Sequence, residues 1–525
     1  MSRTERRRAR QAKATKGRKR GKGKPSRAPV KAAPVPVVKK TDYTAGSYPA
    51  TTVLAAGDRH LVSRFSYGTT PELIAAVNAA GGALPWFEAQ IADAGSTEDE
   101  SLADWWPDLH LSAGEIHLRN QLRLRYDFKV MWDYSRRLLL RRGGTRLQVR
   151  EVMTEFWENH FHVPVDRSFY LRVRRPYGDL MRANAFSSFR TLLPAAIGHP
   201  AMLIYLDNAT STKTHPNENL ARELLELHTV GVGNFTEDDV KNAARLLTGW
   251  TVRTSSPYDA YLDQAQHHVG SVKILGFTHA NRAGEGIAAT AAFLDYLARH
   301  PATAQRVARK LATTFVSDTP SQALVDELAR VYLANDTATV PVLRAMIASN
   351  EFKGAVGAKL RDTNQDLVAT LRTLGVGFQR PAAVDDKSGA NELNGAANLM
   401  GLGPQAWPAP NGVPQVSGAW ASPGRTMASM KLHWLVATRS WPTLRVTHPT
   451  PASWMPAATM TFRDLVDHLA RRLHGRASTT ALLQAACLAT GLTPTSTLTR
   501  NSSAANAAMP PLLAMFLDHP DHLHR

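Results

Sequence analysis

Glutamates and an arginine at helical spacing form the strongest candidate chemical site in the sequence. Residues 215–250 read HPNENLARELLELHTVGVGNFTEDDVKNAARLLTGW. If the first part is a helix, 100° per residue places Glu218, Arg222, Glu223 and Glu226 on one face and leucines on the opposite face. Carboxylates gathered in this way can act as general acid and base or bind a cation, with Arg222 steering an anionic substrate. We therefore predict these four residues to be catalytic.

The same spacing also has a purely structural interpretation. Glu218 and Glu226 each lie four residues from Arg222, so the three side chains could form a ladder of ion pairs on a solvated helix face. His228 projects among the leucines, a position typical of a core or capping histidine. Spacing alone does not decide between the two interpretations.

Polar residues around this segment could complete a binding site. Asn217 and Asn219 crowd the predicted helix start, where free backbone amides favour an anion. Lys273 follows in a predicted hairpin, and Trp250 ends the segment. We expect Asn217, Asn219, Trp250 and Lys273 to bind the substrate.

Three histidines are the predicted metal ligands: His160, His162 and His215. His160 and His162 would share one face of a strand, and the following Val163-Pro164 favours extended backbone at this point. Imidazole together with carboxylate suits Zn, Mn or Fe, so the cofactor that this pattern predicts is a divalent metal. The alternative interpretation is a turn or surface histidine in each case.

The charge of the chain is concentrated at its start. The 525 residues carry a formal net charge of +19, and residues 1–40 hold sixteen Lys and Arg against one acid, Glu5. Such a run cannot bury enough apolar surface to offset chain entropy, so we predict a disordered basic tail over residues 1–45. The tail could bind polyanions non-specifically through counterion release.

Targeting and redox signals are few. No window reaches the ~18 apolar residues that a membrane span needs, and no apolar stretch follows the arginines as a secretory signal requires. We therefore expect a cytoplasmic protein, with co-export alongside a partner as the less favoured route. The single cysteine, Cys487, excludes an internal disulfide.

From about residue 46 the pattern is that of one mainly α-helical domain, 46–525, with one small β-hairpin near residues 271–277. Thr70 with Pro71, and Thr236 with Asp239, are helix-start signals. Residues 115–142 carry an apolar stripe at intervals of four, typical of a core-facing helix. A loop rich in Gly, Pro and Trp spans residues 401–423 and is expected to form one wall of a cleft.

With these residues in place, the chain resembles the bacterial family catalogued as domain of unknown function 1800. The resemblance lies in residues 217–227, 229–231, 235–240 and 248–250, in the Phe-Trp-Glu-Asn-His-Phe motif at 156–161, in Arg309-Lys310-Leu311 and in the loop from Met400 to Trp420. It extends over nearly all of residues 58–525. Many relatives carry an export signal, which we do not expect for this chain, and Val269 stands where relatives have an aspartate.

Membership of this family implies a shared architecture and polar core without a settled reaction. Genes of relatives often neighbour those of a second family that resembles sulfatases. Two hypotheses follow: a hydrolase-like enzyme, metal-assisted or acid/base, and a non-catalytic helical scaffold that partners the sulfatase-like protein.

Overall fold

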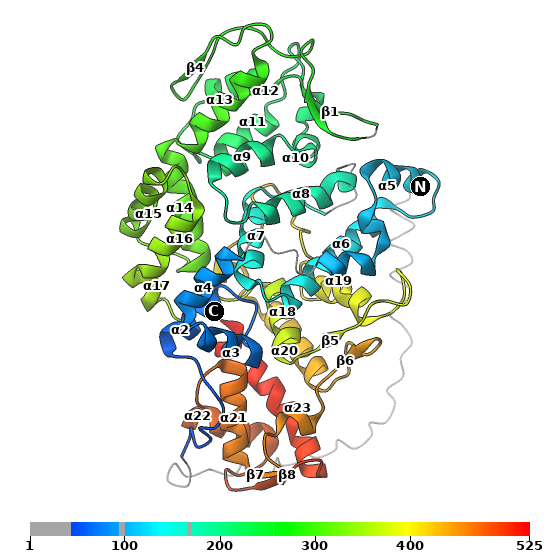
Figure 1. Ribbon diagram of the computed structural model, residues 1–525, viewed down its shortest axis with the longest axis vertical. Helices are drawn as coiled ribbons and strands as arrows, with labels where there is room; N and C mark the ends of the chain where they lie inside the picture. The colour runs from blue at the N-terminus through cyan, green and yellow to red at the C-terminus, as the bar shows by residue number, and fades with distance from the viewer. Residues whose placement is uncertain (1–43, 94–99, 166–169, 256) are drawn as a thin grey trace, which may run out of the picture. The chain divides into compact units, whose positions relative to one another are not determined.

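Helices form most of the regular structure in the computed structural model, which describes residues 44–93, 100–165, 170–255 and 257–525 (Figure 1). The predicted mainly α-helical class is confirmed. The predicted basic tail lies almost entirely outside the described residues, so its boundary with the helical domain stays a prediction. The described residues all belong to one structural unit, which extends from Lys40 to Arg525.

The helices of the first half are α2 Ala56–Arg64, α3 Pro71–Ala79, α4 Ala83–Ala92, η2 Glu100–Trp105, η3 Pro107–His110, α5 Ala113–Gln121, α6 Asp127–Gly144, α7 Gln148–His160, α8 Leu171–Ala183, α9 Phe189–Ile197, α10 Pro200–Tyr205, η4 Asn208–Thr210, α11 Asn219–Glu223, η5 Leu224–His228 and α12 Glu237–Leu247. Here η denotes a 3₁₀-helix, except that η5 is a turn of π-helix. The helices of the second half are α13 Gly286–Ala298, α14 Pro301–Phe315, α15 Gln322–Ala334, α16 Thr339–Ala348, α17 Asn350–Gly354, α18 Thr363–Thr373, α19 Gly389–Leu399, η6 Ser417–Ala419, α20 Pro423–Ala437, η7 Pro451–Trp454, α21 Phe462–His474, α22 Thr480–Thr490, α23 Ser503–Leu517 and α24 Pro520–Leu523.

Two helix starts that the sequence predicts are confirmed. The side chain of Thr70 accepts a hydrogen bond from the amide of Leu73, and Pro71 occupies the first position of α3. Thr236 and Asp239 form a reciprocal capping box at the start of α12. These local signals satisfy backbone amides that would otherwise lack partners.

Strands occur only in short antiparallel pairs within the described part of the chain. The predicted hairpin is present as β3 Val272–Ile274 and β4 Phe277–His279. Three further pairs join β1 Trp250–Val252 with β2 Ala260–Leu262, β5 Gly377–Phe378 with β6 Val446–Thr447, and β7 Thr459–Thr461 with β8 Thr497–Thr499. The last two pairs connect segments far apart in the sequence, so no local alternation could have indicated them.

The predicted stripe over residues 115–142 is only half correct. The chain breaks between α5 and α6, where Arg123 adopts a positive φ of 55°. Val130 and Tyr134 are buried as expected, whereas Leu118, Leu122 and Tyr126 are exposed. The spacing of four predicts a shared face only within one continuous helix. The left-handed residue ends α5 and changes the direction of the chain, so residues before and after it need not share a face.

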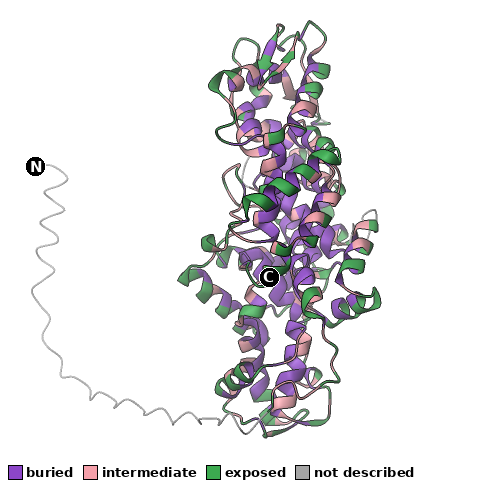
Figure 2. Cartoon of the chain, turned by 90° about the vertical axis from the view of Figure 1, so that its left-hand side faces the viewer, coloured by how far each residue is buried: buried purple, intermediate pink, exposed green. Residues whose placement is uncertain are grey.

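Helices α6, α7 and α8 pack against one another, and α6 also contacts α18 and α19. Buried residues run through the interior of the helical unit, and exposed residues lie toward its outside (Figure 2). The interface contains buried ion pairs: Glu151 accepts from Arg141 at 2.9 Å and from Arg182 at 2.5 Å, and Glu158 pairs with Arg174 at 3.3 Å. Removing one member of such a pair typically costs about 3–5 kcal/mol, since a buried charge is left alone. The network therefore fixes how α7 sits against its neighbours.

Among the described helices, none has the length and apolar character needed to cross a bilayer.

Candidate functional site

The carboxylate-rich segment is helical, but it is not one regular helix. It begins as α11 and continues as the π-turn η5, so the 100° projection fails after Leu224. Arg222 donates to both carboxylate oxygens of Glu237, at 2.9 and 2.7 Å, and to Glu218 at 3.4 Å. The side chain of Glu218 is 42% exposed and that of Arg222 is 34% exposed. This end of the segment is a solvated ion cluster whose second acid comes from α12.

The other two predicted glutamates influence each other, and Glu226 also acts on Arg306 of α14. Burial raises the pKa of Glu223, and the adjacent Glu226 raises it further. Burial lowers the pKa of Arg306, and the Glu226 carboxylate opposes that shift. The Nε of Arg306 donates to the carbonyl of Leu227 at 2.9 Å. The π-turn is therefore attached to α14.

Of the four predicted substrate-binding residues, two neighbours are bonded to each other, and no hydrogen bond joins the other two to them in the described part of the chain. The Oδ1 of Asn217 accepts from the amide of Asn219 at 2.9 Å, which forms a turn before α11. The indole of Trp250 donates to Thr290 at 3.1 Å. Lys273 is exposed on β3. Their role in binding stays a prediction.

The three predicted metal ligands do not form a metal-binding group with one another or with the described acids. His160 ends α7 and is buried, and its Nε2 donates to the carbonyl of His228 at 3.0 Å. His162 is also buried, and its Nε2 donates to the carbonyl of Trp407 at 2.7 Å. His215 is exposed beside Thr214. The fit of a metal to these three residues is therefore poor, and their metal role stays a prediction.

The end of α7 instead holds the Gly/Pro/Trp-rich loop. The side-chain amide of Gln405 donates to Glu158 at 2.9 Å, and His162 donates to Trp407 as described above. Asn159 donates to the carbonyl of Val413 at 3.0 Å and accepts from the amide of Val413 at 2.5 Å. Three closely spaced residues thus attach a loop that lies some 250 residues later in the chain.

Gly412 allows the loop to lie in close contact with Asn159 near the end of α7. Its φ is +75°, and a Cβ at this position would collide with the carbonyl oxygen of Asn159. Any larger residue would be strained in the backbone and would press against the end of α7.

A cavity of about 370 Å³ lies between the loop, α7 and α14. It is lined by Phe156, Asn159, His160, Arg309, Lys310, Thr313, Thr314, Asn411, Gly412, Val413, Pro414 and Gln415. The expectation that the loop forms one wall of a cleft agrees with this lining. Among these lining residues Arg309 and Lys310 are the basic side chains and none is acidic, so the cavity is electropositive.

Lys310 has the most unusual environment in the cavity. It is partly buried, and it makes no side-chain hydrogen bond or ion pair with any residue that the structure describes. Burial, aided by the nearby Arg306, lowers the pKa of its ammonium to about 7. At neutral pH a large share of Lys310 is thus a free amine that can take a proton.

His160 and His228 are neutral neighbours of this lysine. Burial lowers the pKa of both rings, and the charge of Lys310 lowers each further, that of His228 to about 3. Because carbonyls only accept, His160 carries its proton on Nε2 and His228 on Nδ1. The buried His160 Nδ1 and His228 Nε2 keep lone pairs without a partner among the described residues.

The three parts of this site, the 156–161 motif, Arg309-Lys310-Leu311 and the long loop, are among the segments in which the sequence resembles a known family. In a comparison with family models, the one described as "Protein of unknown function (DUF1800)" matches residues 60–524. The chain belongs to the DUF1800 family. No curated protein and no solved structure matches the chain in the corresponding searches.

This DUF1800 chain also contains a buried charged cluster that the sequence did not indicate. Asp366 of α18 accepts from His433 at 3.1 Å and from Ser429 at 2.5 Å, and His433 donates to Asp518 at 2.7 Å. Together with His522, Asp366 and His433 have the spacing of a metal site. Burial alone would lower the pKa of His433, but Asp366 and Asp518 raise it to about 9. Both ring nitrogens of His433 face carboxylates, so as an imidazolium it donates twice within an ion network.

Sequence reasoning missed Lys310 and His433 as site candidates. For Lys310 a signal existed, since the residue belongs to a quoted family motif, but nothing local shows that a lysine lacks an acidic partner. For His433 there was no signal, because Asp366 lies 67 residues away.

Proposed function

We propose that this protein is a hydrolase-like acid/base enzyme that binds a small anionic substrate in the cavity between α7, α14 and the loop 401–416. One observation carries the proposal: Lys310 faces an electropositive 370 Å³ cavity without an acidic partner among the described residues. An uncompensated ammonium in such a place costs stability, and functional sites are where such costs are commonly tolerated.

The roles follow from the chemistry of each side chain. Arg309, which is exposed and donates to Gln322, supplies the charge that attracts the anion. The neutral amine of Lys310 acts as general base, because its pKa near 7 matches neutral conditions. The free Nδ1 of His160 offers a hydrogen-bond acceptor to the protonated intermediate.

The predicted glutamates enter this proposal at the edge of the site. The carboxylate of Glu226 raises the pKa of Arg306. Arg306 lies one turn before Lys310, and its charge lowers the pKa of Lys310. Glu226 therefore tunes the charge around the base, and Glu223 lies beside Glu226, whose charge raises the pKa of Glu223. Arg222 and Glu218 belong to the solvated cluster with Glu237 and are the members of the predicted catalytic set that this site needs least.

The test combines anion binding with a pH profile. Inorganic phosphate should raise the melting temperature of the wild type, and Lys310→Met and Arg309→Met should reduce that rise. The exposed Lys353→Met serves as the matched control. Turnover of small anionic esters should depend on a group with a pKa near 7 that is lost in Lys310→Arg. Equal phosphate response in all four proteins would exclude the proposal.

The partner-protein alternative is supported by a different observation. Leu399 of α19 and Met427 of α20 are 83% and 72% exposed beside a groove of about 700 Å³. Apolar side chains gathered on a surface are typical of protein interaction sites. Co-purification with the sulfatase-like neighbour, lost in Leu399→Glu and Met427→Glu but kept in Lys310→Met, would favour this alternative.

A further inference from the structure

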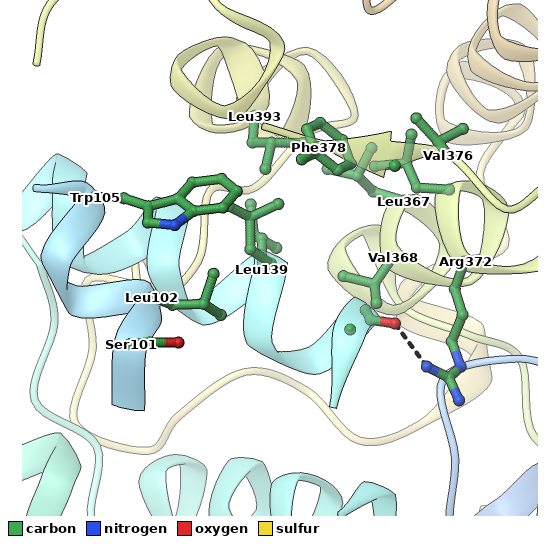
Figure 3. Close-up of a pocket in the computed structure, with 15 residues that line it drawn as sticks. Ser101, Leu102, Trp105, Leu139, Leu367, Val368, Arg372, Val376, Phe378 and Leu393 are labelled. Carbon is green, nitrogen blue, oxygen red and sulfur yellow. Dashed lines mark hydrogen bonds between the residues drawn. The ribbon is translucent and has the colours of Figure 1, made fainter. Parts of the chain in front are cut away.

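A second cavity, of about 510 Å³, lies between α6, α18, α19 and η2 (Figure 3). Its volume falls in the range of pockets that hold small organic ligands. It shares no lining residue with the cavity around Lys310. The two sites can therefore be tested separately.

The walls of this second cavity are strongly apolar. Figure 3 shows Trp105, Leu139, Leu367, Phe378 and Leu393 around the same space. They come from η2, α6, α18, β5 and α19, so the cavity is built by elements distant in the sequence. Such walls favour the apolar body of a ligand, because burial against them removes its surface from water.

One side of the cavity is lined by glycines. Gly143 and Gly144 end α6, and a Cβ at Gly144 would meet no atom within 4 Å. The missing side chains leave room beside the carbonyl of Gly143, which accepts from Arg372 at 2.6 Å. The chain thus keeps open the space next to the Arg372 guanidinium.

Arg372 is the single charged residue among those that line this cavity. It lies on the side opposite Trp105 in the view of Figure 3, and its hydrogen bond to Gly143 is drawn as a dashed line. No carboxylate of the described residues lies within ion-pair distance, and the buried Nε has no partner among them. Burial lowers its pKa to about 10, partly opposed by Glu72, so the group stays charged at neutral pH.

An apolar cavity with a cation at its edge is complementary to a ligand that has an apolar body and one anionic group. A carboxylate matches the planar guanidinium through paired hydrogen bonds. We propose that this cavity binds a small amphipathic carboxylate, with the hydrocarbon chain against the apolar walls and the carboxylate at Arg372. Neutral molecules of the same length lack the group that Arg372 would pair with, and they bind more weakly.

The experiment compares decanoate with decanol by titration calorimetry. The wild type should bind decanoate saturably and prefer it to decanol by about tenfold or more. Arg372→Gln should remove the preference while keeping weak binding of both compounds. The exposed Arg330→Gln is the matched control and should behave as the wild type does.

A second variant protects the test against misfolding of Arg372→Gln. Gly144 lines the cavity and a Cβ there would meet no atom within 4 Å, so Gly144→Trp should narrow the cavity and weaken both ligands without disturbing the core. Equal binding of decanoate and decanol by the wild type, or unchanged decanoate binding in Gly144→Trp, would overturn the proposal. Binding to phosphatidylcholine vesicles in place of free decanoate would also overturn it, by indicating a membrane-lipid surface.

Discussion

The rings of His160 and His228 each donate a hydrogen bond to the backbone carbonyl of the other residue, both at 3.0 Å. This reciprocal pair joins the end of α7 to the end of the π-turn η5. The π-turn shifts the register of the last residues of the segment, and His228 is fully buried at its end. The carboxylate-rich segment and the cavity with Lys310 are thus parts of one connected structure.

We expect the His160–His228 pair to make the protein sensitive to acid. The folded pKa of His228, about 3, lies below its unfolded value near 6.5, so the unfolded chain binds the extra proton first. The contribution of the neutral His228 to the unfolding free energy is complete above pH 6.5. It falls by about 1.4 kcal/mol for each pH unit as the pH decreases to 3.

Urea unfolding at pH 7 and pH 5 measures this effect. His228→Asn should be less stable than the wild type at pH 7 and should lose less stability between the two pH values. Other buried histidines titrate in the same range, and the difference between variant and wild type cancels their contribution. An identical loss in both proteins would show that His228 is already charged or exposed.

The opposite dependence is expected for His433. Its folded pKa, about 9, lies above the unfolded value, so its stabilisation is complete below pH 6.5 and disappears as pH rises to 9. The full contribution is about 3 kcal/mol. His433→Gln should be less stable at pH 6.5, and its unfolding free energy should change less between pH 6.5 and 9.5 than that of the wild type.

The helix caps and the long loop are features that local sequence patterns predict. Thr70 and Thr236 were identified as helix caps because capping depends on neighbours within four positions. The long loop was expected to line a cleft because its composition excludes regular structure. These features are local, and local patterns carry them.

The features that the sequence could not give depend on distant partners. Arg222 pairs with Glu218 as its spacing predicts, but its second ion partner is Glu237 and not Glu226, because the segment turns into a π-helix and α12 packs beside α11. His162 looked like a metal ligand, yet its Nε2 is taken by a carbonyl 245 residues away. Neither partner can be read from spacing along one helix.

Gly412 offers a direct test of the loop attachment. Gly412→Ala should destabilise the protein by about 1–3 kcal/mol, because an alanine is strained at a φ of +75° and its Cβ would meet the end of α7. Hydrogen exchange of residues 405–415 should rise in the variant. Gly418→Ala lies in the same region in open space and should leave both measurements unchanged.

The variant Arg222→Ala tests whether the ion cluster of Arg222 lies at the surface or belongs to the core. Arg222→Ala should cost about 1 kcal/mol or less, because its ion pairs with Glu218 and Glu237 are exposed to solvent. The loss should shrink further in high salt. Complete unfolding of this variant in thermal denaturation would mean that the cluster is part of the core.

Lys310→Met gives the sharpest distinction between a functional and a structural lysine. A lysine that the fold requires has an acidic partner, and its removal destabilises the protein. Lys310 has none among the described residues, and its lowered pKa shows that the folded state disfavours the charged form. Lys310→Met should therefore be as stable as the wild type or more stable, by up to about 1–2 kcal/mol at pH 6, while it loses the phosphate response.

The gain in stability of Lys310→Met should depend on pH. The gain should shrink as pH rises from 7 toward 10. In this range Lys310 is neutral in the folded wild type, whereas the unfolded chain still binds the proton, so the unfolding free energy of the wild type rises with pH. Denaturant unfolding at pH 6 and pH 10 measures the difference, and Lys353→Met should show no such trend. A marked loss of stability in Lys310→Met at pH 6 would mean that the amine is bonded in solution and cannot serve as a base.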